Sequence, residues 1–150
     1  MSFYYKPEEI TLEALNKRGA NTMADWIGIE FCEIGPDYLV AKMPVDRRTV
    51  QPLGVVNGGA FCALAETLGS TAANLCIDRS KYVSLGLDIN ANHLRSANKG
   101  FVYGTAKAFH IGKSTQVWEI KITDEDQNLC CISRLTMANV PLHPDGKRSA

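Results

Sequence analysis

The segment spanning residues 60–77 constrains the fold of this chain more than any other. It is rich in alanine and leucine and carries small or apolar side chains on nearly every side of a helix. This pattern is typical of a buried helix, because an exposed amphipathic helix would keep one polar face. Asn57 is a good N-cap for it, since its side chain can accept a hydrogen bond from the first helical N–H groups. We therefore expect a long helix that the rest of the chain must cover.

Strand-like runs surround this helix. Two of them flank the turn signal Gly35-Pro36-Asp37, within residues 29–45. Two short helical segments precede them, over residues 11–19 and 23–28. After the long helix, four runs separated by turn residues follow one another, over residues 82–91, 100–110, 115–123 and 129–140. This order predicts an α+β domain in which an antiparallel sheet wraps around the long central helix.

Composition excludes several classes of protein. The 150 residues fit one domain, 1–150, and sixteen basic and sixteen acidic residues give a formal net charge of zero. Nucleic-acid-binding and polybasic membrane proteins have a less even balance of basic and acidic residues. No apolar run is long enough to span a bilayer, and the first seven residues lack the apolar stretch of a signal peptide. The five cysteines form no C-x-x-C pair, so we expect reduced thiols and a cytoplasmic protein, without disulfides or a zinc site.

Glu66 is the one charged residue between Arg48 and Asp78. A carboxylate among apolar residues loses hydration, and a desolvated carboxylate is a natural general base or nucleophile. On a helix, Ser70 lies four residues further along the same face, so its hydroxyl can reach the carboxylate. The alternatives are a surface helix on which Glu66 points to water, or a structural ion pair.

The start of the same helix offers a second chemical element. Gly58 and Gly59 occupy its first turn, where N–H groups have no helical partner and the macrodipole favours negative charge. Such donors suit a developing oxyanion, and Gln51 and Asn57 add neutral amide donors nearby. Gly58 and Glu66 are about 12 Å apart along the axis, at about 1.5 Å per residue. We therefore expect Glu66 to face Gly58 of another subunit in a two-fold dimer.

Further polar residues could meet phosphates or substrate. Gly112-Lys113-Ser114 is similar to the end of a P-loop, but Lys107 stands where its first glycine belongs, and a strand pattern follows instead of a helix. His93, at a strand end beside polar neighbours, is either structural or a substrate contact. The other side chains at strand ends are either phosphate contacts or ordinary solvated charge: Arg95, Lys107, His110, Lys113 and Ser114.

Residues 51–60 (Gln-Pro-Leu-Gly-Val-Val-Asn-Gly-Gly-Ala) and 64–70 (Leu-Ala-Glu-Thr-Leu-Gly-Ser) resemble the hotdog-fold acyl-CoA thioesterases. The resemblance extends over residues 10–138. It is closest to the bacterial branch of the 1,4-dihydroxy-2-naphthoyl-CoA thioesterase of menaquinone biosynthesis and the enterobactin-pathway proofreading thioesterase. It implies a sheet around a long helix, an acyl-CoA substrate, and a homodimer that pairs into a homotetramer. It also implies hydrolysis without a metal or any cofactor beyond the coenzyme A of the substrate.

The resemblance also implies a role for each matching residue. Glu66 would act as the nucleophile or as the base on water, with Ser70 beside it. Gly58 N–H would polarise the thioester carbonyl, and Gln51 would position that carbonyl or the water. His93 matches a histidine near the acyl pocket. The implied contacts of CoA are Arg95, Ser96, His110, Gly112 and Lys113, and the apolar candidates for the acyl pocket are Leu53, Phe61 and Leu68.

One departure concerns Asn57, where this branch usually has histidine. Asparagine can donate a hydrogen bond but cannot titrate. A CoA thiol, with a pKa of about 8.5, can leave without a strong acid, so we expect a lower rate or altered acyl preference. The expected function is hydrolysis of an aromatic (1,4-dihydroxy-2-naphthoyl-like) or medium-chain acyl-CoA. The alternatives are a non-catalytic acyl-CoA-binding hotdog protein and a hotdog hydratase or dehydratase.

Overall fold

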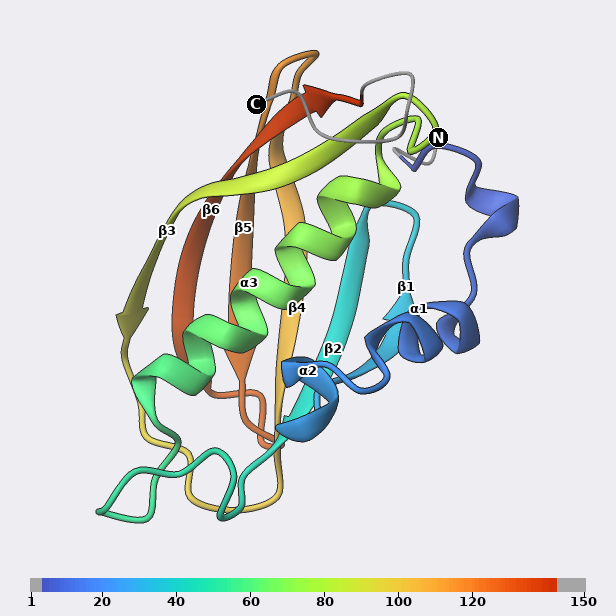
Figure 1. Ribbon diagram of the computed structural model, residues 1–150. Coiled ribbons are helices and arrows are strands. Elements are labelled where there is room, and N and C mark those ends of the chain that lie inside the picture. The colour runs from blue at the N-terminus through green and yellow to red at the C-terminus, as the bar shows by residue number, and fades with distance from the viewer. Residues whose placement is uncertain (1–3, 143–150) are drawn as a thin grey trace.

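The structure is a computed structural model that describes residues 4–142. Six strands form one antiparallel sheet in the order β1-β2-β4-β5-β6-β3 (Figure 1). They are β1 (Glu30–Ile34), β2 (Tyr38–Pro44), β3 (Tyr82–His93), β4 (Phe101–Ile111), β5 (Thr115–Thr123) and β6 (Leu129–Pro141). The helices are α1 (Leu12–Gly19), α2 (Met23–Trp26) and α3 (Gly58–Leu75), preceded by a 3-10 turn at Pro7–Glu9. Within residues 4–142, no helix is long and apolar enough to cross a membrane.

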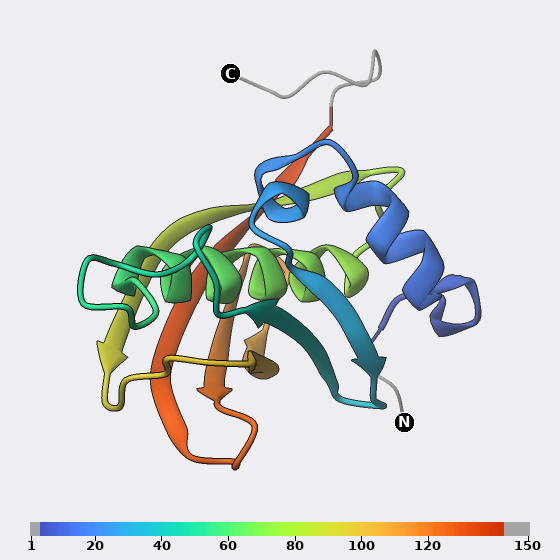
Figure 2. The same cartoon turned by 90° about the horizontal axis from the view of Figure 1, so that it is seen from below.

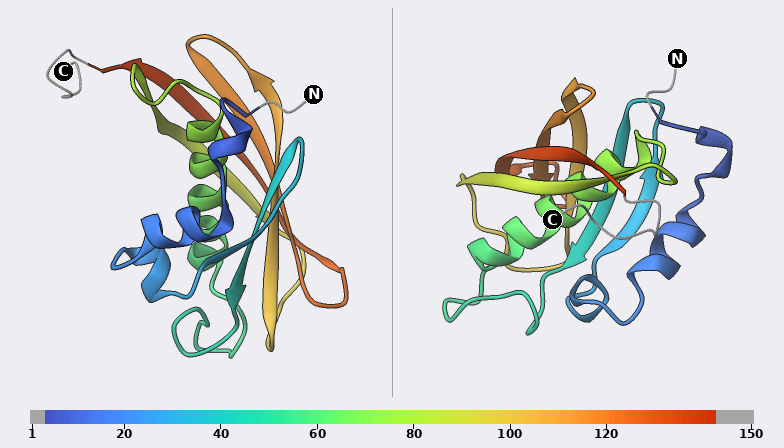
Figure 3. Two further views of the ribbon diagram at one scale, coloured as in Figure 1. Left: turned by 90° about the vertical axis from the view of Figure 1, so that its right-hand side faces the viewer. Right: turned by 45° about the horizontal axis from the view of Figure 1, so that its top comes forward.

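The sheet curves around α3, which crosses its concave face (Figures 1 and 3). Leu64 and Leu68 of α3 are fully buried in the core that the helix forms with the strands. Gly69 lets the helix approach β6 closely, because a methyl group built there would lie 2.6 Å from Leu135 Cδ2. The predicted α+β architecture, an antiparallel sheet around a long helix, is confirmed.

The two short helices lie beside α3, towards the β1 edge of the sheet (Figure 2). The side chain of Thr11 caps α1 by accepting a hydrogen bond from Ala14 N–H at 3.1 Å. Helix α3 ends two residues before its predicted end, since Cys76 already takes the C-cap and its N–H bonds Ala73 O. Strand β3 reaches His93, two residues beyond the prediction, because pairing with β6 continues to Cys131.

The burial of Leu68 leads to a stability prediction. We expect Leu68→Ala to lower the free energy of unfolding by about 2–5 kcal/mol, because the side chain is fully buried and its loss leaves a cavity. The matched control is Leu53→Ala, at a side chain that is 84% exposed, which should change that free energy by about 0.5 kcal/mol or less. Urea unfolding at one protein concentration measures both, and equal losses would contradict this assignment of the core.

Candidate active site

Among residues 4–142, the start of α3 finds no partner for one of its backbone donors. Asn57 Oδ1 accepts a hydrogen bond from Gly59 N–H at 2.7 Å, which confirms the predicted N-cap. The Asn57 carbonyl oxygen accepts from the N–H groups of Ala60 and Phe61 at 2.9 and 3.2 Å. Gly58 N–H makes no hydrogen bond within the described residues. An unpaired N–H at a helix N-terminus, with the macrodipole behind it, is a donor for a negatively charged or polarised oxygen.

A hollow of about 260 Å³ opens at Gly58. The ring of His93, at the end of β3, lies over this residue, since a methyl group built on Gly58 would lie 2.8 Å from His93 Nε2. The same ring stacks on Phe61 with centroids 5.7 Å apart and planes inclined by 23°. The structure thus brings together predicted residues from the loop, the helix and β3. The hollow is lined by Gln51, Gly58, Phe61, His93, Arg95 and Ser96, together with Val56 and Leu94.

Gln51 is held in the loop by its own side chain. Its Oε1 accepts a hydrogen bond from Leu53 N–H at 2.7 Å. Its Nε2 makes no hydrogen bond within residues 4–142. With the carboxamide oriented in this way, the NH₂ group is left as a neutral donor at the hollow.

Glu66 lies two turns further along α3, on the flank that faces β3. Its Oε1 accepts a hydrogen bond from Ser70 Oγ at 2.8 Å, and Ser70 Oγ also lies 3.8 Å from Met137 Sδ. Gly86 of β3 lies against the same oxygen, because a methyl group built there would be 2.7 Å from Oε1. The side chain is neither fully exposed nor ion-paired within the described chain, and Oε2 accepts no hydrogen bond there. The carboxylate is thus held through one oxygen and has the other free.

These two groups of residues do not meet within one chain. We call Gln51, Gly58 and His93 the carbonyl half-site, and Glu66, Ser70 and Gly86 the carboxylate half-site. Glu66 follows Gly58 by two helical turns, about 12 Å at about 1.5 Å per residue. One reacting carbonyl cannot contact both half-sites of the same chain.

Other predicted residues lie elsewhere. Leu68 is fully buried in the core against β4, since a methyl group built on Gly104 would lie 3.1 Å from its Cδ2, and it does not line the hollow. Leu53 is largely exposed in the loop before α3. His110, Gly112 and Lys113 lie in or beside the β4–β5 turn. Because β3 and β4 run in opposite directions, this turn lies at the other end of the sheet from His93 (Figure 1).

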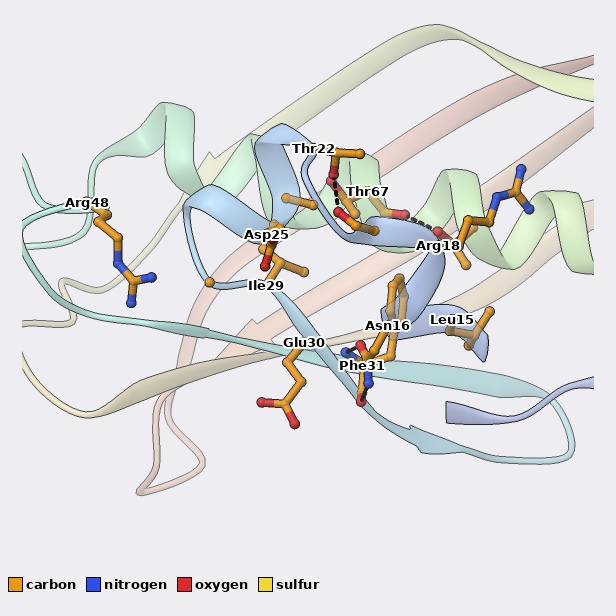
Figure 4. A pocket seen from close by; sticks show the side chains of 14 residues that line it. Leu15, Asn16, Arg18, Thr22, Asp25, Ile29, Glu30, Phe31, Arg48 and Thr67 are labelled. Atoms are coloured by element: carbon orange, nitrogen blue, oxygen red, sulfur yellow. Dashed lines mark hydrogen bonds between the residues drawn. The ribbon is translucent and has the colours of Figure 1, made fainter. Parts of the chain in front are cut away.

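A larger hollow of about 560 Å³ lies on the opposite flank of α3, between that helix, α1, α2 and β1 (Figure 4). Thr67 and Thr71 of α3 line it. They directly follow Glu66 and Ser70 in the chain and so lie on a different flank of the helix. Two of its charged side chains are already paired, Arg48 with Asp46 and Glu30 with Lys42. None of the predicted site residues lines it, so its size does not make it the candidate active site.

Two buried cysteines are poor candidates for a catalytic nucleophile. All five are free thiols. Burial raises the pKa of Cys76 to about 12 and that of Cys131 to about 11, which makes both poor nucleophiles. No group of three or more His, Cys, Asp or Glu side chains within residues 4–142 is arranged to hold a metal ion.

The cap at Asn57 leads to a second prediction. We expect Asn57→Ala to lower the free energy of unfolding by about 1 kcal/mol, because Gly59 N–H loses its acceptor. Asn57→Asp keeps a side-chain oxygen in that place and should stay close to the original chain. Thermal or urea unfolding of the three proteins measures this difference, and equal losses in both variants would contradict a capping role.

Comparison with known proteins identifies the family of this chain. The thioesterase superfamily model matches residues 53–131. The chain is 52% identical over 130 residues to the 1,4-dihydroxy-2-naphthoyl-CoA hydrolase of Escherichia coli, covering 87% of this chain and 95% of that protein. It is 46% identical over 129 residues to the proofreading thioesterase EntH of Cronobacter turicensis, covering 86% and 93%. A mutant thioesterase from Pseudomonas aeruginosa superposes with a TM-score of 0.91 at 45% identity, covering 94% of this chain and 100% of that one. The chain therefore belongs to the thioesterase superfamily.

Proposed function

We propose that this protein hydrolyses an acyl-CoA thioester to the free acid and coenzyme A. The observation that carries the proposal is the Gly58 N–H at the start of α3, which has no hydrogen-bond partner in the part of the chain that the structure describes. This N–H lies at a hollow that further donors line. A thioester carbonyl placed there would gain a hydrogen bond as negative charge develops on its oxygen. The relatives named as a CoA hydrolase and a proofreading thioesterase support the same reaction.

Glu66 supplies the other half of the reaction. Either it activates a water molecule that attacks the thioester carbon, or it attacks that carbon itself and water then hydrolyses the resulting anhydride. In both courses the carbon–sulfur bond breaks and coenzyme A leaves as a thiolate. Because the pKa of its thiol is about 8.5, coenzyme A needs no strong acid to leave. Ser70 holds Oε1, so Oε2 is the oxygen that meets water or substrate.

The two half-sites require a second subunit. Strand β3 is an edge of the sheet, and its outer side pairs with no other strand of the described chain. Antiparallel pairing of two β3 strands about a two-fold axis would carry Glu66 of one subunit towards the partner subunit's Gly58. The same rotation would turn the partner subunit's Arg95 towards the end of the sheet that holds His110 and Lys113. A dimer of this kind would bring both predicted sets of CoA contacts into one site.

The acyl group and the biological setting form the finer part of the proposal. An aromatic acyl group of the 1,4-dihydroxy-2-naphthoyl kind, or a medium-chain one, fits a hollow lined by Phe61, Val56 and Leu94. We infer menaquinone biosynthesis as the pathway, the cytoplasm as the compartment and a pair of dimers as the assembly. The identity to the Escherichia coli hydrolase supports the aromatic substrate.

Thiol release from an acyl-CoA panel tests the reaction. We expect hydrolysis of 1,4-dihydroxy-2-naphthoyl-CoA, benzoyl-CoA or hexanoyl-CoA, and a loss of about a hundredfold or more in Glu66→Gln, because the carboxylate is replaced by a neutral isostere. Binding of acyl-CoA without thiol release by the unmodified protein would contradict the proposal. It would favour a binding protein, in which Asn57 serves α3 only as its cap.

Mixed oligomers test the shared site. Gly58→Pro removes the N–H donor at a helix position that tolerates proline, and Gly58→Ala keeps the donor but adds the same Cβ beside His93. We expect Gly58→Pro to lose about a hundredfold to a thousandfold in rate and Gly58→Ala clearly less. Heterodimers of Glu66→Gln and Gly58→Pro subunits, purified through two tags, should regain about half the normal rate, because one of their two sites is intact. Activity that stays at the level of the separate variants would place both groups in one chain.

A further inference from the structure

The side chain of Asn74 takes the place of a neighbouring strand at one point of the β3 edge. Its Oδ1 accepts a hydrogen bond from Ser84 N–H at 3.0 Å, and its Nδ2 donates to Ser84 O at 2.9 Å. Nδ2 also donates to Ser70 O on α3, at 2.9 Å. The backbone of Ser84 therefore points away from β6 and is bound by a helix side chain, so no second strand can pair there. The open edge of β3 begins beyond this residue.

Asn74 also belongs to the stripe of α3 that carries the carboxylate. Glu66, Ser70 and Asn74 follow one another at intervals of four residues and share one face. Ser70 binds Glu66 through its hydroxyl and Asn74 through its carbonyl oxygen. Two residues after Ser84, Gly86 lies against Glu66 Oε1. The carboxylate thus lies between α3 and β3, and the hydrogen bonds of Asn74 link these two elements.

The strand is irregular at this point. The register between β3 and β6 shifts between Gly86 and Asp88, where a β-bulge interrupts the ladder. Gly86 pairs with Met137 and Asp88 with Thr136, so the bulge leaves Leu87 outside the register and makes the strand irregular directly after Gly86. The two hydrogen bonds between the Asn74 side chain and the Ser84 backbone fix β3 immediately before the bulge.

We infer that Asn74 is a positioning residue for the hydrolysis proposed above. By fixing Ser84, it holds Gly86 against Glu66 Oε1 and leaves Oε2 directed to the reacting carbonyl. It also limits the open edge of β3 to Gly86 and beyond. Antiparallel pairing of the remaining edge, which ends at His93, would then place Gly86 opposite the partner subunit's His93. This inference rests on the proposed function.

The chain contains a matched control at the other edge of the sheet. Asn16 of α1 binds Phe31 of β1 in the same way: its Oδ1 accepts from Phe31 N–H at 2.8 Å and its Nδ2 donates to Phe31 O at 3.0 Å. Asn16 and Phe31 lie together at the larger hollow (Figure 4), and Glu66 is not among the residues that line it. Asn16→Ala therefore removes equivalent bonds to an edge strand without touching the carboxylate half-site.

The experiment compares Asn74→Ala and Asn16→Ala by thermal unfolding and by steady-state kinetics on the best acyl-CoA of the panel. We expect both variants to lose thermal stability. Only Asn74→Ala should lose kcat, by about tenfold to a hundredfold, because Glu66 is misplaced. KM should stay within about twofold, since the CoA contacts lie elsewhere. In a Glu66→Gln background, Asn74→Ala should cause no further loss, because it acts through the carboxylate.

Each result separates the two claims. An unmodified protein that releases no thiol would overturn the proposed function and this inference with it. An active protein in which Asn74→Ala keeps its kcat, or in which both asparagine variants lose kcat equally, would overturn the positioning role alone. If Asn74→Ala does not fold, Asn74→Asp gives the same comparison, because it keeps the acceptor for Ser84 N–H and loses both Nδ2 donors.

Discussion

The burial of α3 by one curved sheet is the constraint on which the rest of this structure depends. The fully buried Leu64 and Leu68 fix the rotation of the helix against the strands, and Gly69 lets it approach β6 closely. Once that rotation is set, the polar stripe that includes Glu66 can face only β3. The first turn of the helix then opens at the end of the sheet where β3 ends, beside His93. The packing of the core therefore directs both chemical groups of the site.

The length of α3 has an equally direct consequence. The donor at Gly58 and the carboxylate at Glu66 stand on one rigid helix, so neither can move to the other within a chain. Strand β3 is an edge strand, and such an edge invites pairing with a second chain. The carboxamide of Asn74 closes the β3 edge at Ser84, and that of Asn16 closes the β1 edge at Phe31. The part of the β3 edge that stays open then runs from Gly86 to His93. The edge that Asn74 partly closes and the edge at which the shared site is proposed therefore belong to the same strand, β3.

Much of the fold could be predicted from local patterns. The alanine-rich helix, its cap at Asn57 and the four late strands lie within a few residues of their expected ends. The sequence also indicated Glu66, because a single charge in an apolar helix is visible without any structure. It did not indicate Gly86 or Asn74, since one glycine in a strand and one asparagine in a helix carry no local signal. Leu68 was expected to contact substrate, but it packs into the core because its face of the helix turns to β4.

By itself, the sequence determined which residues could do chemistry: a carboxylate without charged neighbours in the chain, and a glycine at a helix start where N–H groups lack partners. These properties are local, because they depend on residues within one or two helical turns. Only the tertiary structure decided which of them meet. In the structure His93 lies over Gly58 and Gly86 lies against Glu66. Lys113 lies at the other end of the sheet from His93. Such neighbours are set by strand order and helix rotation, which arise from the packing of the whole core and not from any single segment.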